Sequence, residues 1–137
     1  RPASIIQSLS ALTFMLVRKN NPMLAFSASV NAPRGPAPTL HIETPLVYSE
    51  TFSKHLGAEV YLKMDCLQPP GSFKIRGIGE TVRRAVESGA GRIVSSSGGN
   101  AGMAAAYAAR ALGVPCTVVL PTTTPQSVHK RLQSFGA

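Results

Sequence analysis

The sequence predicts an α/β fold in which helices cover both faces of a parallel sheet. From residue 40 onward, short apolar runs alternate with longer segments of helical periodicity, in the order strand, helix, strand, helix, strand, helix. This order builds a parallel sheet through right-handed crossovers. The chain stops after the third helix, where a further strand is expected, so the predicted sheet is incomplete.

The first predicted unit is a strand, a loop and a helix. Residues 59–64 alternate between polar and apolar side chains, as a half-buried strand does. The Pro/Gly-rich residues 65–72 predict a loop. A helix is expected over residues 73–88, where Gly89 can end it in the left-handed conformation.

The following elements repeat this order. A strand is expected over residues 92–95, and a helix over residues 101–112 that Gly113 closes. A third strand is expected over residues 116–120.

The last predicted helix follows the third strand. Thr124 is expected to be its N-cap and Pro125 its first helical residue, because proline needs no backbone donor there. The helix is expected to end before Gly136.

Residues 1–39 are predicted to be a basic, Pro/Ser-rich extension that is poorly ordered and lies apart from the fold. The first acidic residue is Glu43, and residues 31–38 resemble a linker punctuated by Pro and Gly. Transit peptides are also basic, Ser-rich and poor in acids, so a mitochondrial location is the alternative to the cytoplasm. The apolar run in residues 4–17 is too short to span a bilayer.

The bulk composition is that of a globular protein, with 44% hydrophobic and 15% charged residues. The net charge of +8 raises the question of nucleic-acid binding, but the cations are scattered and aromatics make up only 6%. Solvated helix faces explain these cations, and neither nucleic acid nor a membrane is expected as a partner. Cys66 and Cys116 lack close Cys or His companions, so we expect reduced thiols and no metal.

Lys74 is the first candidate for chemistry. It stands at the mouth of a predicted helix, directly after a Pro/Gly loop. The positive end of a helix dipole disfavours a cation, which favours the neutral amine that attacks carbonyl groups. An ordinary solvated lysine in a turn is the alternative.

Residues 95–102 are the second candidate, a Ser/Gly-rich loop between a strand and a helix of small residues. Glycines there can expose several amides at the helix start, which predicts an anion site. A tight turn that binds nothing is the alternative. Neither loop fits G-x-G-x-x-G or the Walker A motif, which excludes the common nucleotide sites.

Together these segments resemble the serine dehydratase branch of the fold-type II pyridoxal-phosphate enzymes, a fold like that of the tryptophan synthase β chain. Three runs carry the resemblance: LKMD at 62–65, QPPGSFKIRG at 68–77 and SSGGNAG at 96–102. Supporting matches are TPL at 44–46, AAYAAR at 105–110 and PTTTP at 121–125. The resemblance covers residues 40–137, which would be the N-terminal part of the catalytic domain.

The resemblance implies roles for individual residues. Lys74 would hold pyridoxal 5'-phosphate covalently and act as the catalytic base, Phe73 would lie against the cofactor ring, and Asn100 would bind the ring hydroxyl. The substrate carboxylate would lie among residues 97–101: Ser97, Gly98, Gly99, Asn100 and Ala101. A helix cap at Ser72 and a core residue at Phe73 are the structural alternatives, and Cys66 is expected to be a spectator.

The implied reaction is β-elimination on a small amino acid, which gives pyruvate and ammonia from L-serine and 2-oxobutanoate from L-threonine. Threonine synthase, racemase or sulfhydrylase chemistry is the alternative within the fold, and a non-catalytic fragment with an anion loop is the alternative outside it. The family's phosphate-binding loop and ring-nitrogen partner lie further along the chain, so these residues alone are expected to be inactive. The complete protein is expected to be a homodimer.

Two positions depart from the family's pattern. Pro70 stands where many relatives have Ser, in a loop where a second proline is not expected to disturb the chemistry. Gly98 stands where some members have Ala, which leaves the substrate preference open.

Overall fold

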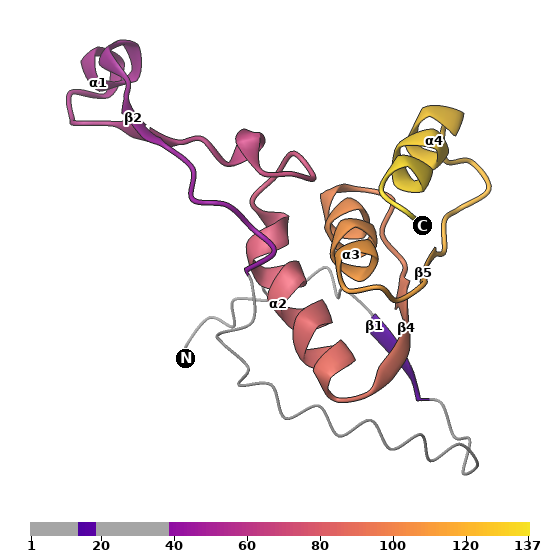
Figure 1. Cartoon of the computed structure of the whole chain (residues 1–137). Coiled ribbons are helices and arrows are strands. Elements are labelled where there is room, and N and C mark those ends of the chain that lie inside the picture. The colour runs from indigo at the N-terminus through magenta and orange to yellow at the C-terminus, as the bar shows by residue number, and fades with distance from the viewer. Residues whose placement is uncertain (1–13, 19–38) are drawn as a thin grey trace, which may run out of the picture.

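The computed structural model describes residues 14–18 and 39–137 (Figure 1). These residues form a three-stranded sheet with the order β1-β4-β5 and a separate two-stranded sheet of β2 and β3. In Figure 1 the β2–β3 ribbon extends away from the body formed by α2, α3 and the larger sheet.

The larger sheet contains the predicted parallel pair. β4 (Ala90–Ser95) and β5 (Cys116–Val118) run parallel, with Ile93 opposite Cys116. The helix α3 (Asn100–Ala111) connects them, as a crossover helix should. The strands predicted over 92–95 and 116–120 and their parallel pairing are therefore confirmed, although β5 ends two residues early.

The other edge of β4 pairs with a segment from the predicted N-terminal extension. β1 (Phe14–Arg18) lies antiparallel to β4, with Phe14 opposite Ser95. The remainder of residues 1–38 lies outside the described residues. The division of the chain at residue 39 therefore stays a prediction.

The strand predicted over residues 59–64 does not join the parallel sheet. β3 (Tyr61–Lys63) pairs antiparallel with β2 (Leu46–Tyr48), and every residue of both strands is exposed. The expectation of three strands in one parallel sheet is wrong at this strand. The physical reason lies in the pattern itself, because alternation is typical of antiparallel strands with a wet face, whereas parallel strands read as continuous apolar runs.

The helix α1 (Glu50–Leu56) follows β2 and was not expected from the sequence. Ser49 caps it by accepting a hydrogen bond from the amide of Phe52. Its seven residues are shorter than the windows in which helical periodicity becomes visible.

The remaining helices follow the predictions closely. α2 (Lys74–Glu87) and α3 each lie within one residue of the predicted bounds. Gly89 (φ 91°) and Gly113 (φ 71°) adopt the left-handed conformation expected after them. α4 (Gln126–Ser134) ends before Gly136 as predicted.

The predicted cap of α4 is wrong by one residue. Pro125 is the N-cap, with a ψ of 142°, so the helical conformation begins at Gln126 and not at Pro125. Thr124 instead donates its amide to the carbonyl of Pro121, which closes a turn before the helix.

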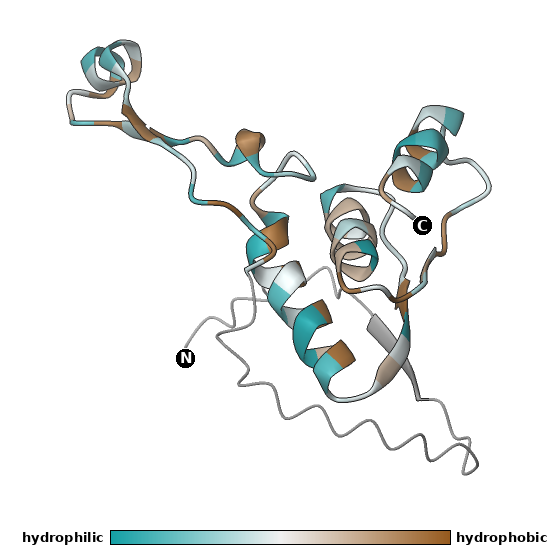
Figure 2. Ribbon diagram, in the orientation of Figure 1, coloured by the Kyte–Doolittle hydropathy of each residue, from teal (hydrophilic) through white to brown (hydrophobic). Residues whose placement is uncertain are grey.

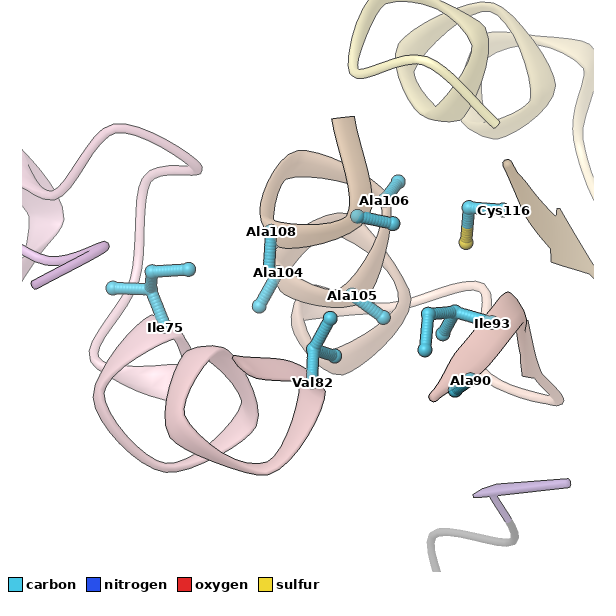
Figure 3. Packing of buried hydrophobic residues seen from close by; sticks show 10 residues of the cluster. Ile75, Val82, Ala90, Ile93, Ala104, Ala105, Ala106, Ala108 and Cys116 are labelled. Atoms are coloured by element: carbon cyan, nitrogen blue, oxygen red, sulfur yellow. The ribbon is translucent and has the colours of Figure 1, made fainter. Parts of the chain in front are cut away.

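The core is built where α2 packs on α3. Ile75 and Val82 of α2 point toward small side chains of α3 in the close-up of Figure 3. Figure 2 shows α2 striped in teal and brown, whereas α3 is mostly pale, because nearly all its buried residues are small. The alanines allow a close approach of the helices. The buried members from α3 are Ala104, Ala105, Ala106, Ala108 and Ala109.

Candidate functional site

Lys74 is the first residue of α2, as the sequence predicts. A short 3-10 helix (Asp65–Leu67) and the Pro/Gly loop lead into it. Lys74 is half-buried, and its Nζ lies 5.2 Å from the centroid of the Phe73 ring. The amine is therefore held at the helix start and retains access to solvent.

The side chain of Ser72 is not a helix cap, and Phe73 is not a core residue, which were the structural alternatives for these two positions. Phe73 is 59% exposed, so it is not a core residue. The Ser72 hydroxyl is buried, caps nothing and has no hydrogen-bond partner among the described residues. A buried hydroxyl without a partner is costly, and a large exposed aromatic ring beside it is free to contact a ligand.

The second loop, residues 96–99, connects β4 to α3 and is held by its own serines. The Ser95 hydroxyl accepts a hydrogen bond from the amide of Ser97, and the Ser97 hydroxyl accepts one from the amide of Gly99, both at 3.3 Å. These local bonds shape the loop. The Ser97 hydroxyl keeps its own hydrogen free to donate.

The N-terminus of α3 presents unpaired donors. The N-cap is Gly99, which has no side chain, and Asn100 is exposed at the first helical position. Within the described part of the chain, the amides of Asn100, Ala101 and Gly102 donate no hydrogen bond, although the carbonyl oxygen of Ser97 packs against Gly102. Free amides at the positive end of a helix are the kind of donors that bind anions.

Gly102 lies at the end of the predicted 95–102 segment, outside the residues 97–101 to which ligand-binding roles were assigned. A Cβ at this position would overlap the backbone carbonyl oxygen of Ser97. Only glycine therefore allows the first turn of α3 to fold back against the loop. At Gly98 a Cβ would lie 2.9 Å from Cδ2 of Leu120, the flexible end of a side chain, so the constraint is weaker.

The structure brings the two candidate segments to the same end of the sheet. α2 and α3 lie side by side, and both begin at the end where β4 finishes (Figure 1). Ile75, the residue after Lys74, belongs to the same buried cluster as Ala104 of α3. This is the carboxyl edge of the parallel strands, where α/β sheets bind their ligands.

A polar cluster lies behind the start of α2. Asp65 accepts two hydrogen bonds from the Arg76 guanidinium, both at 2.9 Å, and further bonds from Thr44 and Gln68. Arg76 holds the pKa of the Asp65 carboxyl well below its usual range, and Asp65 in turn raises the pKa of Arg76. No local pattern in the sequence predicts this cluster.

Acid should weaken this cluster. Because the pKa of Asp65 is lowered in the folded state, its stabilisation is complete above the unfolded value of about 3.9 and is lost as the pH falls below that value. We expect Asp65→Asn to lower the melting temperature more at about pH 7 than at about pH 3. An equal loss at both pH values would contradict the assignment.

The wild type must be compared with Asp65→Asn at each pH, because a second carboxyl group titrates in the same acid range. The guanidinium groups of Arg83 and Arg84 lower the pKa of Glu80 to about 2. Glu80 contributes equally to the wild type and to Asp65→Asn, so the difference between the two proteins isolates Asp65.

Other candidate features lie away from Lys74. A cavity of about 130 Å³ lies between β5 and α4, lined by residues such as Leu120, His129 and Leu132. In residues 14–18 and 39–137, no cluster of three or more His, Cys, Asp or Glu could hold a metal ion. No helix described for this chain is long and apolar enough to cross a membrane.

Curated relatives of this chain include serine and threonine deaminases. The chain is 57% identical over 98 residues to the L-serine dehydratase/L-threonine deaminase of Homo sapiens, covering 72% of this chain and 30% of that protein. The chain spans about 30% of the length of this protein and of its counterparts from Bos taurus and Mus musculus, which it also matches.

Solved structures agree on the fold. A fungal L-serine ammonia-lyase from Rhizomucor miehei superposes with a TM-score of 0.64 at 34% identity, covering 72% of this chain and 32% of that one. A pyridoxal 5'-phosphate-dependent aspartate racemase superposes with a TM-score of 0.67 at 36% identity, covering 71% of this chain and 32% of that one. The α/β fold expected from the resemblance is therefore confirmed.

A family match covers nearly the whole described region. Residues 38–137 match the family described as pyridoxal-phosphate dependent enzymes. Both segments at the sheet edge fall inside this match, as does the Asp65 cluster. Because this match covers more than half of the chain, the chain belongs to the family of pyridoxal-phosphate dependent enzymes.

Proposed function

We propose that the intact protein is a pyridoxal-phosphate dependent lyase that converts L-serine to pyruvate and ammonia, and L-threonine to 2-oxobutanoate and ammonia. One observation carries the proposal. Lys74 and the free amides at the start of α3 lie at the same edge of the sheet. The 57% identity to a serine and threonine deaminase supports this choice of substrate.

The residues present fit pyridoxal phosphate. The unpaired hydroxyl of Ser72 and the exposed ring of Phe73 are features that a polar aromatic ligand would satisfy. Lys74 would hold the cofactor covalently, Phe73 would contact its ring, and Asn100 would donate to its ring hydroxyl. When bound, the cofactor supplies an electron-withdrawing ring that stabilises negative charge on the substrate α-carbon.

The chain's own groups would bind the substrate and move its proton. The amides of Asn100, Ala101 and Gly102 would bind the substrate carboxylate, assisted by the hydroxyl of Ser97. This orients the α-hydrogen for removal. The ε-amine of Lys74 would accept that proton as general base, and the β-hydroxyl would take up a proton and leave as water.

Product analysis on the intact protein tests the proposal. With pyridoxal phosphate and L-serine, pyruvate and ammonia should appear in equal amounts. Racemisation is the second candidate, because the aspartate racemase resembles this chain as closely as the lyase does. Formation of D-serine without pyruvate would favour the racemase and contradict the lyase.

Asn100→Ala should weaken catalysis more than stability. The Asn100 side chain is exposed and forms no hydrogen bond with any described residue. Its removal therefore leaves no partner unpaired among these residues. We expect kcat/KM for L-serine to fall by about tenfold or more, with a melting temperature within about 2 °C of the wild type. A large loss of melting temperature with unchanged kinetics would mean that Asn100 serves only the fold.

We further propose that the intact protein is a homodimer with a small amino acid as its substrate. Large apolar side chains exposed on β2, β3 and α1 support a partner surface: Leu46, Tyr48, Phe52, Leu56 and Tyr61. A cytoplasmic location, with the mitochondrion as alternative, stays a prediction from the composition of residues 1–39. Sedimentation of the intact protein tests the dimer.

A further inference from the structure

The start of α2 lacks the features that usually hold a helix N-terminus. Its N-cap is Phe73, and no described side chain caps it. The first turn contains no acidic residue but two cations, Lys74 and Arg76. The helix dipole disfavours both charges, so another interaction must fix the turn that contains Lys74.

Asp65 supplies the missing negative charge from outside the helix. Its Oδ2 accepts from Nε of Arg76 and its Oδ1 from Nη2, both at 2.9 Å, which is the bidentate geometry of a strong ion pair. The Asp65 side chain is only 15% exposed and that of Arg76 34%. The pair is therefore shielded from water more than an ordinary surface ion pair.

The pair is anchored on its other side as well. The Thr44 hydroxyl donates to Asp65, and the amide group of Gln68 donates to the carbonyl of Ile42 at 2.8 Å. The backbone amide of Ile42 returns a bond to Gln68 at 3.0 Å. Asp65 thus joins the first turn of α2 to a segment more than twenty residues earlier in the chain.

We infer that Asp65 and Arg76 are a positioning pair that fixes the first turn of α2 and thereby aims the amine of Lys74. The inference rests on the proposed role of Lys74, because it explains how that amine is kept in place. Arg76 lies two residues after Lys74 in the same turn, so releasing its guanidinium leaves the buried side chain of Ile75 to hold this turn alone and loosens the backbone that carries the amine.

The rate at which Lys74 reacts with pyridoxal phosphate tests the inference without any substrate. In the intact, cofactor-free protein, we expect Asp65→Asn and Arg76→Lys each to slow this reaction by about 10- to 100-fold, since small misplacements carry such costs. Arg76→Lys keeps the charge but cannot form the bidentate pair, whereas Asp65→Glu keeps the carboxylate and should recover part of the rate. Absorbance follows the reaction, and borohydride trapping with peptide mapping identifies the lysine.

A matched control is available in α1. Glu50→Gln breaks the ion pair with Lys54, whose side chains are 71% and 76% exposed, and should leave the rate unchanged. If the Asp65 and Arg76 variants melt earlier but react at the wild-type rate, the pair is only structural and the inference is overturned. If Asp65→Asn does not fold, Arg76→Lys decides by the same rate. A wild type that does not react at Lys74 would overturn both the proposed function and this inference.

Discussion

Replacing Lys74 by alanine should lower the turnover of L-serine by about a thousandfold or more in the intact protein. The substitution removes both the covalent holder of the cofactor and the general base, and a base alone contributes about 10² to 10⁴ in rate. The fold should survive, because the side chain is only half-buried and the helix is held by Ile75 and Val82. Ammonia release and circular dichroism measure the two effects.

Lys54→Ala is the matched control for this experiment. Lys54 is an exposed lysine in the short helix α1, whose ion pair contributes little in water. Its removal should leave turnover within about twofold of the wild type. Ammonia release by Lys74→Ala at a near-wild-type rate would show that another group is the base.

Gly102→Ala should destabilise the protein by about 3 kcal/mol or more, at the upper end of overpacking costs. The added Cβ would overlap the carbonyl oxygen of Ser97, and backbone atoms cannot move aside as a side chain can. The loop and the first turn of α3 must separate, which also displaces the free amides. Urea unfolding of the intact protein gives the loss of stability.

Gly98→Ala is the contrasting variant in the same loop. Its Cβ would meet three side-chain methyl groups, those of Leu120 at 2.9 Å, Val128 at 3.5 Å and Thr124 at 3.9 Å, and Leu120 can change rotamer. We expect a cost below about 1.5 kcal/mol. Equal losses from the two variants would refute the close approach between Gly102 and Ser97.

The helices and the parallel pair could be predicted because their signals are local. α2 and α3 show sustained periodicity and end at glycines, so their bounds were predicted to within one residue. β2 and α1 contain only three and seven residues, too few for a periodic signal. The pairing of β3 with β2 was missed because the partner of a strand depends on contacts far away in the sequence.

In the candidate site too, the features with local signals could be predicted and those that depend on distant contacts could not. Lys74 and the loop of residues 96–99 are visible as runs of sequence, and the structure places both at helix starts. The ion pair of Asp65 with Arg76 joins residues 11 positions apart through a turn whose path no local pattern predicts. The need for glycine at 102 likewise arises only once the loop folds back on its helix.

Borohydride reduction of the intact protein loaded with pyridoxal phosphate, followed by peptide mapping, identifies the lysine that holds the cofactor. Before reduction, the bound cofactor should show an absorption band at about 410 nm, and reduction should abolish this band. The account predicts that the reduced cofactor is found on the peptide that contains Lys74, in about one equivalent per chain. Label on another lysine, with Lys74 unmodified, would contradict it.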